Sequence, residues 1–221
     1  MYSIEDQVED WKTVFLAQKG NSIFCNVDDS YIADPFNLTN LDKDIDNYKS
    51  ALKLILNDIT LSKIKGLHLK KIWDSACFLY GQIHARYILT NDGMLKMLDK
   101  YENSAFGTCP RVQCDQQSLI PVGIDDRVGV ARVKFYCCNC EDVYEPDGQC
   151  NKEIDGAFFT TTFPHLFFLS FPHLKPKTKF KIDRYVPRMF GYKIYRHSKL
   201  HKWQERERTK AIWESISKLP V

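Results

Sequence analysis

Four cysteines in the middle of the chain have the spacing of metal ligands. Cys109 and Cys114 form a C-x4-C pair, Cys137 and Cys140 form a C-x2-C pair, and residues 115–136 separate the two pairs. A short turn between two cysteines brings both thiolates to one side of an ion, at about 2.3 Å from a zinc. Two such pairs complete a tetrahedron and leave no position open for water or substrate. The pattern therefore predicts one structural Zn2+ ion per chain, at a site that stabilises a fold and performs no catalysis.

The same cysteines could instead form two disulfides or act as small apolar core residues. Disulfides need an oxidising compartment, whereas the first residues, Met1 to Gln7, lack the basic and apolar segments of a secretory signal. We therefore expect a cytoplasmic and nuclear protein. In such a reducing compartment, paired cysteines are more often metal ligands. Cys138 competes within the second pair, but C-x2-C is the usual spacing and favours Cys137 and Cys140. The remaining cysteines are expected to be ordinary thiols: Cys25, Cys77 and Cys150.

The elements around this quartet change character along the chain. Apolar residues recur at helical spacing in the first half and predict helices over residues 8–18, 41–56, 69–88 and 94–101. After Thr108 the pattern becomes short β-like runs over residues 119–122, 128–136, 142–144 and 157–160. The apolar run from Phe158 to Phe171 is interpreted as a buried strand pair. A helical half followed by a strand-rich half predicts an α+β fold, with a helical domain over residues 1–104, a β-rich zinc-ribbon domain over 105–172 and a C-terminal segment over 173–221.

Composition and charge narrow the class of protein. The chain has 221 residues, 44% apolar and 27% charged, which is typical of globular proteins, and it has no apolar run of the 18 or more residues that span a bilayer. The net charge of +3 conceals an asymmetry, because residues 1–60 carry −6 and residues 175–221 carry +10. Charged partners, or contact between the two ends, would explain this asymmetry, although most single charges are solvated surface. The ribbon itself, residues 109–146, carries −2, which argues against a phosphate-binding surface.

Enzyme motifs are absent from the sequence. There is no Gly-rich dinucleotide fingerprint, no phosphate-binding loop, no nucleophile elbow and no protein-kinase catalytic loop. His84 lies among aromatic residues at helical spacing, where a packed core histidine is expected.

Apolar residues flank the proposed ligands, and they allow two interpretations. Pro110, Val112, Val143 and Tyr144 either fill the small core around the metal or face another subunit. The sequence leaves both open.

Long motifs occur in a fixed order between Val8 and Tyr195. They are DPFNLT at residues 34–39, LYGQIHARYILTN at 79–91, FGTCPRV at 106–112, DGAF at 155–158, FPH at 163–165 and VPRMFGYKI at 186–194. In these motifs the chain resembles the regulatory beta subunits of casein kinase II.

The resemblance implies a non-catalytic regulatory and scaffolding subunit of a tetrameric Ser/Thr kinase. Its implied ligands are the four cysteines named above, and its implied dimer interface contains Pro110, Val112, Val143 and Tyr144. The homodimer would recruit two catalytic alpha subunits, which act on protein substrates. The implied kinase-binding hairpin contains Arg188, Met189, Phe190, Gly191, Tyr192, Lys193 and Ile194. Phe190 and Tyr192 occupy the aromatic positions where the family usually has Tyr and then Phe. We expect binding to survive this swap, because either order keeps two large rings and one hydroxyl. Buried aromatic anchors at a hairpin tip contribute about 2–4 kcal/mol each.

Two departures limit what the resemblance implies. The family's acidic loop corresponds to residues 57–66, which carry one acid and two lysines, so we expect no polyamine regulation through this segment. Ser3, followed by Glu5 and Asp6, is the one phosphorylation candidate in place of a serine cluster. The C-terminal helix expected over residues 198–219 has no assigned role. The alternative function is a zinc ribbon that binds nucleic acid, or associates with transcription, through the basic tail.

Overall fold

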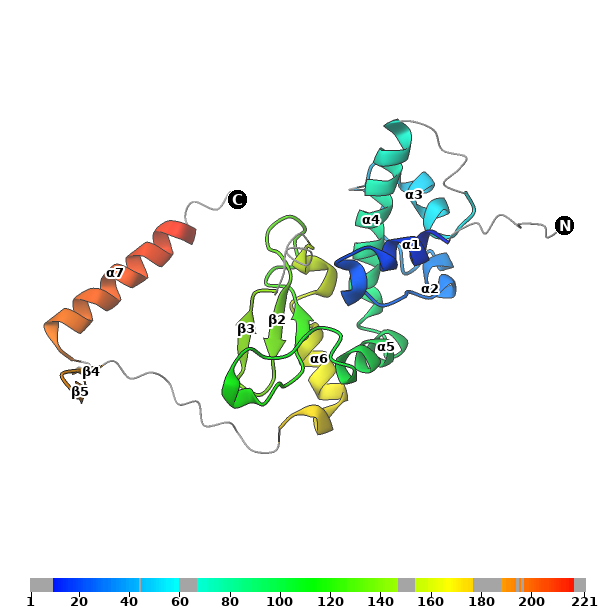
Figure 1. The fold of residues 1–221 in the computed structure, drawn as a ribbon. Coiled ribbons are helices and arrows are strands. Elements are labelled where there is room, and N and C mark those ends of the chain that lie inside the picture. Colours follow the sequence, from blue (N-terminus) through cyan, green and yellow to red (C-terminus); the bar gives the residue numbers. More distant parts are fainter. Residues whose placement is uncertain are drawn as a thin grey trace. The chain divides into compact units, whose positions relative to one another are not determined.

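The computed structural model describes residues 10–43, 45–59, 67–146, 154–176, 188–193, 195 and 197–216. The chain divides into two compact units, residues 1–180 and residues 181–221. Both contain helices and strands, so the fold is mixed (Figure 1). The predicted division at residue 104 stays a prediction.

A long helix organises the first part of the larger unit. Helix α4 (Leu67–Tyr87) is crossed by α1 (Trp11–Ala17), and α3 (Tyr48–Ile55) lies beside its N-terminal half (Figure 1). The short elements η1 (Asn21–Ile23) and α2 (Asp29–Ala33) connect α1 to α3, and α5 (Asn91–Glu102) follows α4. The Thr90 hydroxyl caps α5 by accepting a hydrogen bond from the Gly93 N–H at 3.2 Å, as a Thr before a helix does.

Aromatic rings fill the core between α1 and α4. Trp11 stacks on Phe15 with ring centroids 5.1 Å apart, and the edge of Tyr80 meets both rings at 5.7 and 5.1 Å. Trp11 and Tyr80 are fully buried. Edge-to-face pairs of this kind add about 0.5–1.5 kcal/mol each beyond the burial of apolar area.

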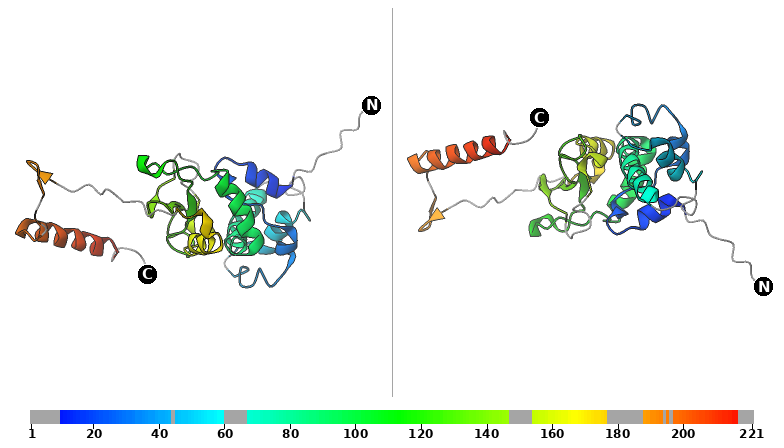
Figure 2. Two further views of the ribbon diagram at one scale, coloured as in Figure 1. Left: turned by 90° about the horizontal axis from the view of Figure 1, so that it is seen from below. Right: turned by 90° about the horizontal axis from the view of Figure 1, so that it is seen from above.

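A three-stranded antiparallel sheet follows the helices. Its order is β1 (Ile120–Val122), β2 (Lys134–Cys137) and β3 (Asp142–Tyr144), with Pro121 opposite Phe135 and Phe135 opposite Tyr144. Helix α6 (Phe163–Ser170) packs against β1, and the short turns η3 (Val112–Cys114), η5 (Gly156–Phe159) and η6 (Pro172–Leu174) complete this part (Figure 2).

One of the tight contacts between the helices and the sheet segment lies between α4 and η5. Gly81 lies under the Phe158 ring so closely that an added Cβ would be 2.6 Å from a ring carbon. The next turn of α4 places His84 Nδ1 2.9 Å from the Phe158 carbonyl oxygen. Phe24 packs on Phe159 with centroids 5.2 Å apart. These contacts hold the helical and sheet segments together in one unit.

The smaller unit contains a hairpin and a helix. The hairpin pairs β4 (Arg188–Met189) with β5 (Tyr192–Lys193), and α7 spans Lys199–Ile216. Among the described residues, no helix has both the length and the apolar character needed to cross a membrane.

Four sequence predictions need correction. The strand pair predicted at Phe158–Phe171 and the β-like run predicted at 157–160 are wrong, because these residues contain the end of η5 and helix α6. Pro164 occupies the first turn of α6, where it is tolerated, and apolar Leu166 and Leu169 occupy exposed positions of this helix, so its buried face does not stand out in the sequence.

The helix predicted over residues 41–56 begins only at Tyr48, because Asn47 has φ +56° and interrupts helical geometry. Leu41 and Ile45 are buried from turns instead. The run 128–136 forms a strand only from Lys134, since Gly129 at φ +82° belongs to a turn.

Candidate metal centre and partner-binding surfaces

The four cysteines of the quartet converge at one end of the sheet. Cys109 precedes the turn that leads into η3, Cys114 ends η3, Cys137 ends β2 and Cys140 closes the turn after β2. Their sulfur atoms all lie within 4.8 Å of one another, and all four residues are buried. Four sulfurs at 2.3 Å from a central ion are about 3.8 Å apart, and Cys109 Sγ lies 3.9 Å from Cys140 Sγ. The four cysteines can therefore hold a metal ion.

Unusual backbone conformations shape both turns. Asp115 and Gln116 follow Cys114 with φ +50° and +53°, and Glu141 follows Cys140 with φ +55°. Non-glycine residues in the left-handed region cost energy, and they persist where the surroundings determine the conformation. Their position directly after each cysteine pair is consistent with turns shaped around a ligand.

The chemistry of the site is that of a closed thiol cluster. Burial disfavours the Cys140 thiolate, but hydrogen bonds from Tyr144, Cys137 and Cys114 together lower its pKa. The Tyr144 hydroxyl lies 3.2 Å from Cys140 Sγ. Four sulfur donors fill a tetrahedral ion, so the site offers no open position for a substrate.

Cys138 is separated from the cluster. Its Sγ lies 3.5 Å from the Tyr101 hydroxyl and 4.0 Å from the Leu174 carbonyl oxygen, toward α5 and η6. None of the seven described cysteines forms a disulfide, and Cys150 lies outside the described residues.

The apolar residues beside the ligands do not fill the core around the site. Val112 is 95% exposed, Val143 is 43% exposed and Pro110 is exposed as well, whereas Tyr144 is half-buried. The core of the sheet is formed by other residues: Leu119, Ile120, Val133 and Phe135. Of the two interpretations that the sequence left open, the core-filling one therefore does not apply to the three exposed residues.

The hairpin presents aromatic side chains to solvent. Phe190 at φ +52° and Gly191 at φ +84° form a two-residue turn of the type that joins tight hairpins. The Arg188 guanidinium donates to the Gly191 carbonyl oxygen at 3.2 Å. Phe190 is 95% exposed, Tyr192 is 80% exposed and Met189 is also exposed. Lys193 is exposed too, and Ile194 lies outside the described residues.

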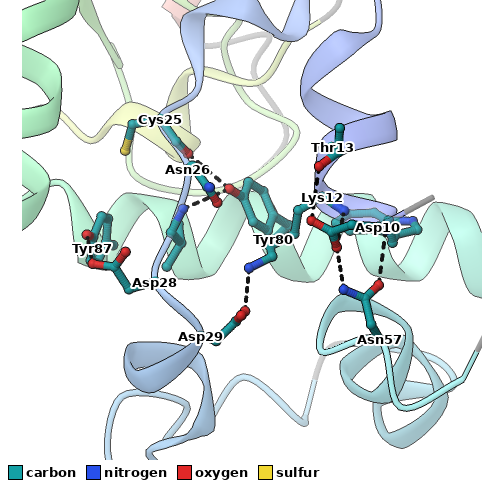
Figure 3. Close-up of polar contacts among 12 residues, drawn as sticks. Asp10, Lys12, Thr13, Cys25, Asn26, Asp28, Asp29, Asn57, Tyr80 and Tyr87 are labelled. Atoms are coloured by element: carbon teal, nitrogen blue, oxygen red, sulfur yellow. Dashed lines mark hydrogen bonds and ion pairs between the residues drawn. The ribbon is translucent and has the colours of Figure 1, made fainter. Parts of the chain in front are cut away.

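One face of α4 binds an extended segment, residues 24–28. Tyr80 donates its hydroxyl proton to the Cys25 carbonyl at 2.9 Å and accepts the Val27 N–H at 3.1 Å (Figure 3). One turn later, His84 Nε2 accepts the Cys25 N–H at 3.1 Å.

Asp28 anchors the end of this extended segment through α4 and α5. Tyr87 donates to Asp28 at 2.6 Å, and the Lys96 ammonium, from α5, lies 2.5 Å from the same carboxylate. Hydrogen bonds from Lys96 and Tyr87 lower the pKa of Asp28.

His84 is a structural residue, as the sequence predicted. Since the Phe158 carbonyl can only accept, Nδ1 carries the proton and Nε2 is free to accept from Cys25. Burial lowers the pKa of His84 to about 4, so the ring is neutral. Sequence reasoning did not anticipate this bridge, because no local pattern marks its two partners.

Comparisons with known proteins agree with this arrangement. The family model for the casein kinase II regulatory subunit matches residues 10–193. The chain is 41% identical to casein kinase II subunit beta' of Saccharomyces cerevisiae, covering 96% of this chain and 83% of that protein. It is 44% identical to casein kinase II subunit beta of Schizosaccharomyces pombe, over 93% and 89% of the two chains. Identity to casein kinase II subunit beta' of Drosophila melanogaster is 45%, over 84% of each chain.

These relatives give no support to the nucleic-acid-binding alternative. The family match covers helices α1 to α6, the cysteine cluster and the hairpin together. The chain therefore belongs to the casein kinase II regulatory subunit family, and its role is that of a regulatory subunit without catalytic activity of its own.

Proposed function

We propose that the chain forms a zinc-dependent homodimer whose hairpins bind two catalytic alpha subunits of casein kinase II. The observation that carries this proposal is the exposure of two aromatic rings on a hairpin of two-residue strands. Such a hairpin is marginally stable alone, and clustered exposed apolar side chains mark binding surfaces. Phe190 and Tyr192 are therefore the proposed anchors, and Met189 and Ile194 are proposed as further contacts.

Zinc is the proposed metal because the donor set consists of sulfur alone. Four thiolates in tetrahedral array suit Zn2+ better than the oxygen-seeking Ca2+ or Mg2+. A bound zinc would contribute folding energy to the ribbon and supply no catalysis. Cys109, Cys114, Cys137 and Cys140 would each give one ligand, with one ion per chain.

The proposed dimer surface depends on that metal. Pro110 and Val112 lie within the turn between the first two ligands, and Val143 and Tyr144 follow the last one on β3. An ion held by both turns fixes all four side chains with respect to one another. Loss of the ion would release these turns and disperse the surface, which is why dimerisation should follow metal occupancy.

The hairpin is tested by co-purification with the catalytic subunit. Phe190→Ala combined with Tyr192→Ala should weaken binding by at least about a thousandfold, since each anchor is worth about 2–4 kcal/mol. Phe36→Ala is the matched control, because Phe36 is another exposed aromatic, 83% accessible, on the larger unit. Retained binding in the double variant, or equal loss in the control, would refute the assignment of the anchors.

The metal site is tested by removing one ligand. Cys109→Ser should lower zinc content and abolish the dimer while the helical part keeps its circular dichroism. Cys138→Ser is the control, since this thiol points away from the cluster. A Cys109→Ser variant that stays dimeric in light scattering would contradict the proposed role of the ribbon.

We also propose where the chain is located and which residue is phosphorylated. The free thiols suit the reducing cytoplasm and nucleus. Ser3 is the proposed N-terminal phosphorylation site and lies outside the described residues, as do residues 60–66 of the segment through which no polyamine regulation is expected.

A further inference from the structure

Thr39 lies at the exposed corner of a turn anchored on both sides. The turn occupies residues 34–43, between α2 and α3, and contains no helix or strand. Leu38 and Leu41 are both 6% exposed and hold it to the core, whereas Thr39 and Asn40 between them face solvent. This arrangement leaves the Thr39 hydroxyl accessible to a second protein.

Acidic residues follow this hydroxyl along the chain. Asp42 stands three positions after Thr39 and Asp46 seven positions after it, and both are exposed. Among all serines and threonines of the sequence, only Ser3 and Thr39 have an acidic residue at the third following position. A kinase whose substrate cleft is lined by cations would recognise this spacing through charge complementarity.

An arginine stands next to the same residue. Arg86, from α4, donates to the Asn37 carbonyl at 2.7 Å and to the Thr39 carbonyl at 3.0 Å. Within the described part of the chain, its guanidinium forms no ion pair with a carboxylate. A phosphate on the Thr39 side chain would therefore meet a cation already fixed beside its own backbone, and such a pair is strong and directional.

We propose that Thr39 is phosphorylated by an acid-directed Ser/Thr protein kinase and that Arg86 binds the phosphate. The Thr39 Oγ1 attacks the γ-phosphorus of Mg-ATP, the bond to the β,γ-bridging oxygen breaks, and ADP leaves. The hydroxyl proton passes to the catalytic base of the kinase. The inference rests on the proposed function only in the choice of casein kinase II as the kinase to test.

Local opening of the turn is part of the reaction. The Thr39 hydroxyl donates to the Phe36 carbonyl at 2.8 Å, and this bond must break before transfer. Leu41 lies between the acceptor and Asp42, so an extended substrate conformation draws it out of the core. The hydrogen bonds of the turn and the burial of Leu41 oppose this movement, whereas a hydroxyl inside a helix would require the helix to unfold.

The test uses the full chain with Ser3→Ala, purified casein kinase II catalytic subunit and Mg-ATP. Site-resolved mass spectrometry should find one phosphate, on Thr39, and Thr39→Val should remove it. Asp42→Asn should slow its incorporation about fivefold or more. Thr162→Val is the control, because Thr162 is exposed and has no acid at the third following position. Absence of phosphate on Thr39, or an unchanged rate with Asp42→Asn, would overturn the proposal.

Two further measurements separate kinase binding by the hairpin from phosphate binding by Arg86. If the chain with its wild-type hairpin fails to bind the catalytic subunit while Thr39 is still phosphorylated, the proposed function fails and this inference stands. Phosphorus NMR of the phosphorylated chain should show a phosphothreonine pKa below the usual value of about 6. Arg86→Gln should return this pKa to about 6, and equal values in the two proteins would refute the role of Arg86.

Discussion

Replacement of His84 by leucine tests how the helices are joined to the sheet. His84 is fully buried and satisfies the Cys25 N–H and the Phe158 carbonyl at once. His84→Leu leaves both backbone groups buried without a partner. Each orphaned group costs about 1–3 kcal/mol, so we expect the free energy of unfolding at pH 7 to fall by about 2–6 kcal/mol.

The pH dependence of stability gives a second, independent signature. Burial lowers the pKa of His84 from 6.5 to about 4, opposed by the Phe158 hydrogen bond and assisted by Lys100. Because the pKa of His84 is lower in the folded chain than in the unfolded chain, the unfolded chain takes up a proton at a higher pH. The neutral ring makes its full contribution to the free energy of unfolding above pH 6.5. This contribution is lost as the pH falls from 6.5 to 4, and it changes no further below pH 4. The whole difference is about 3 kcal/mol, of which about 2 kcal/mol falls between pH 7 and 5.

Urea unfolding of the full chain, followed by circular dichroism at several pH values, measures both effects. The stability curves of wild type and His84→Leu should approach each other by about 2 kcal/mol between pH 7 and 5. His173→Gln, at an exposed histidine, should track the wild type throughout. A leucine variant that keeps the full pH dependence, or that loses no stability at pH 7, would refute the bridge.

Two other substitutions test contacts of α4. Tyr80→Phe removes two buried hydrogen bonds to the extended segment 24–28 and should lower the free energy of unfolding by about 1–3 kcal/mol. The control is Tyr31→Phe, whose hydroxyl has no hydrogen bond among the described residues, and it should cost less than about 0.5 kcal/mol. Equal losses of stability in the two variants would contradict this prediction. Gly81→Ala places a methyl group 2.6 Å from the Phe158 ring and should lower stability by about 1–3 kcal/mol despite the better helix propensity of alanine; a higher melting temperature in the variant would show that the ring moves freely.

Local chemistry explains what the sequence could predict. The spacing of the cysteines brings Cys137 and Cys140 together and turns Cys138 away, since the turn after β2 spans only these residues. The hairpin around Phe190 and Gly191 was expected from the family resemblance, and glycine at its turn supports the positive φ that the structure shows. Such features depend on neighbours within a few positions.

Features that depend on distant partners could not be predicted. His84 reaches Cys25 across 59 residues and Phe158 across 74, so the pattern around it showed a buried histidine and nothing of its bridge. The apolar run of α6 was mistaken for strands because apolar Leu166 and Leu169 occupy exposed positions, so the helix lacks the polar face that would reveal its periodicity. The exposure of Val112 depends on which other residues fill the sheet core, and tertiary packing decides that.

Native mass spectrometry of the purified full chain can show whether the cysteine cluster holds zinc and thereby builds the dimer. We expect a dimer that carries two zinc ions and releases both on chelation as it separates into monomers. A dimer that persists without metal, or a chain that binds zinc and stays monomeric at micromolar concentration, would contradict this expectation.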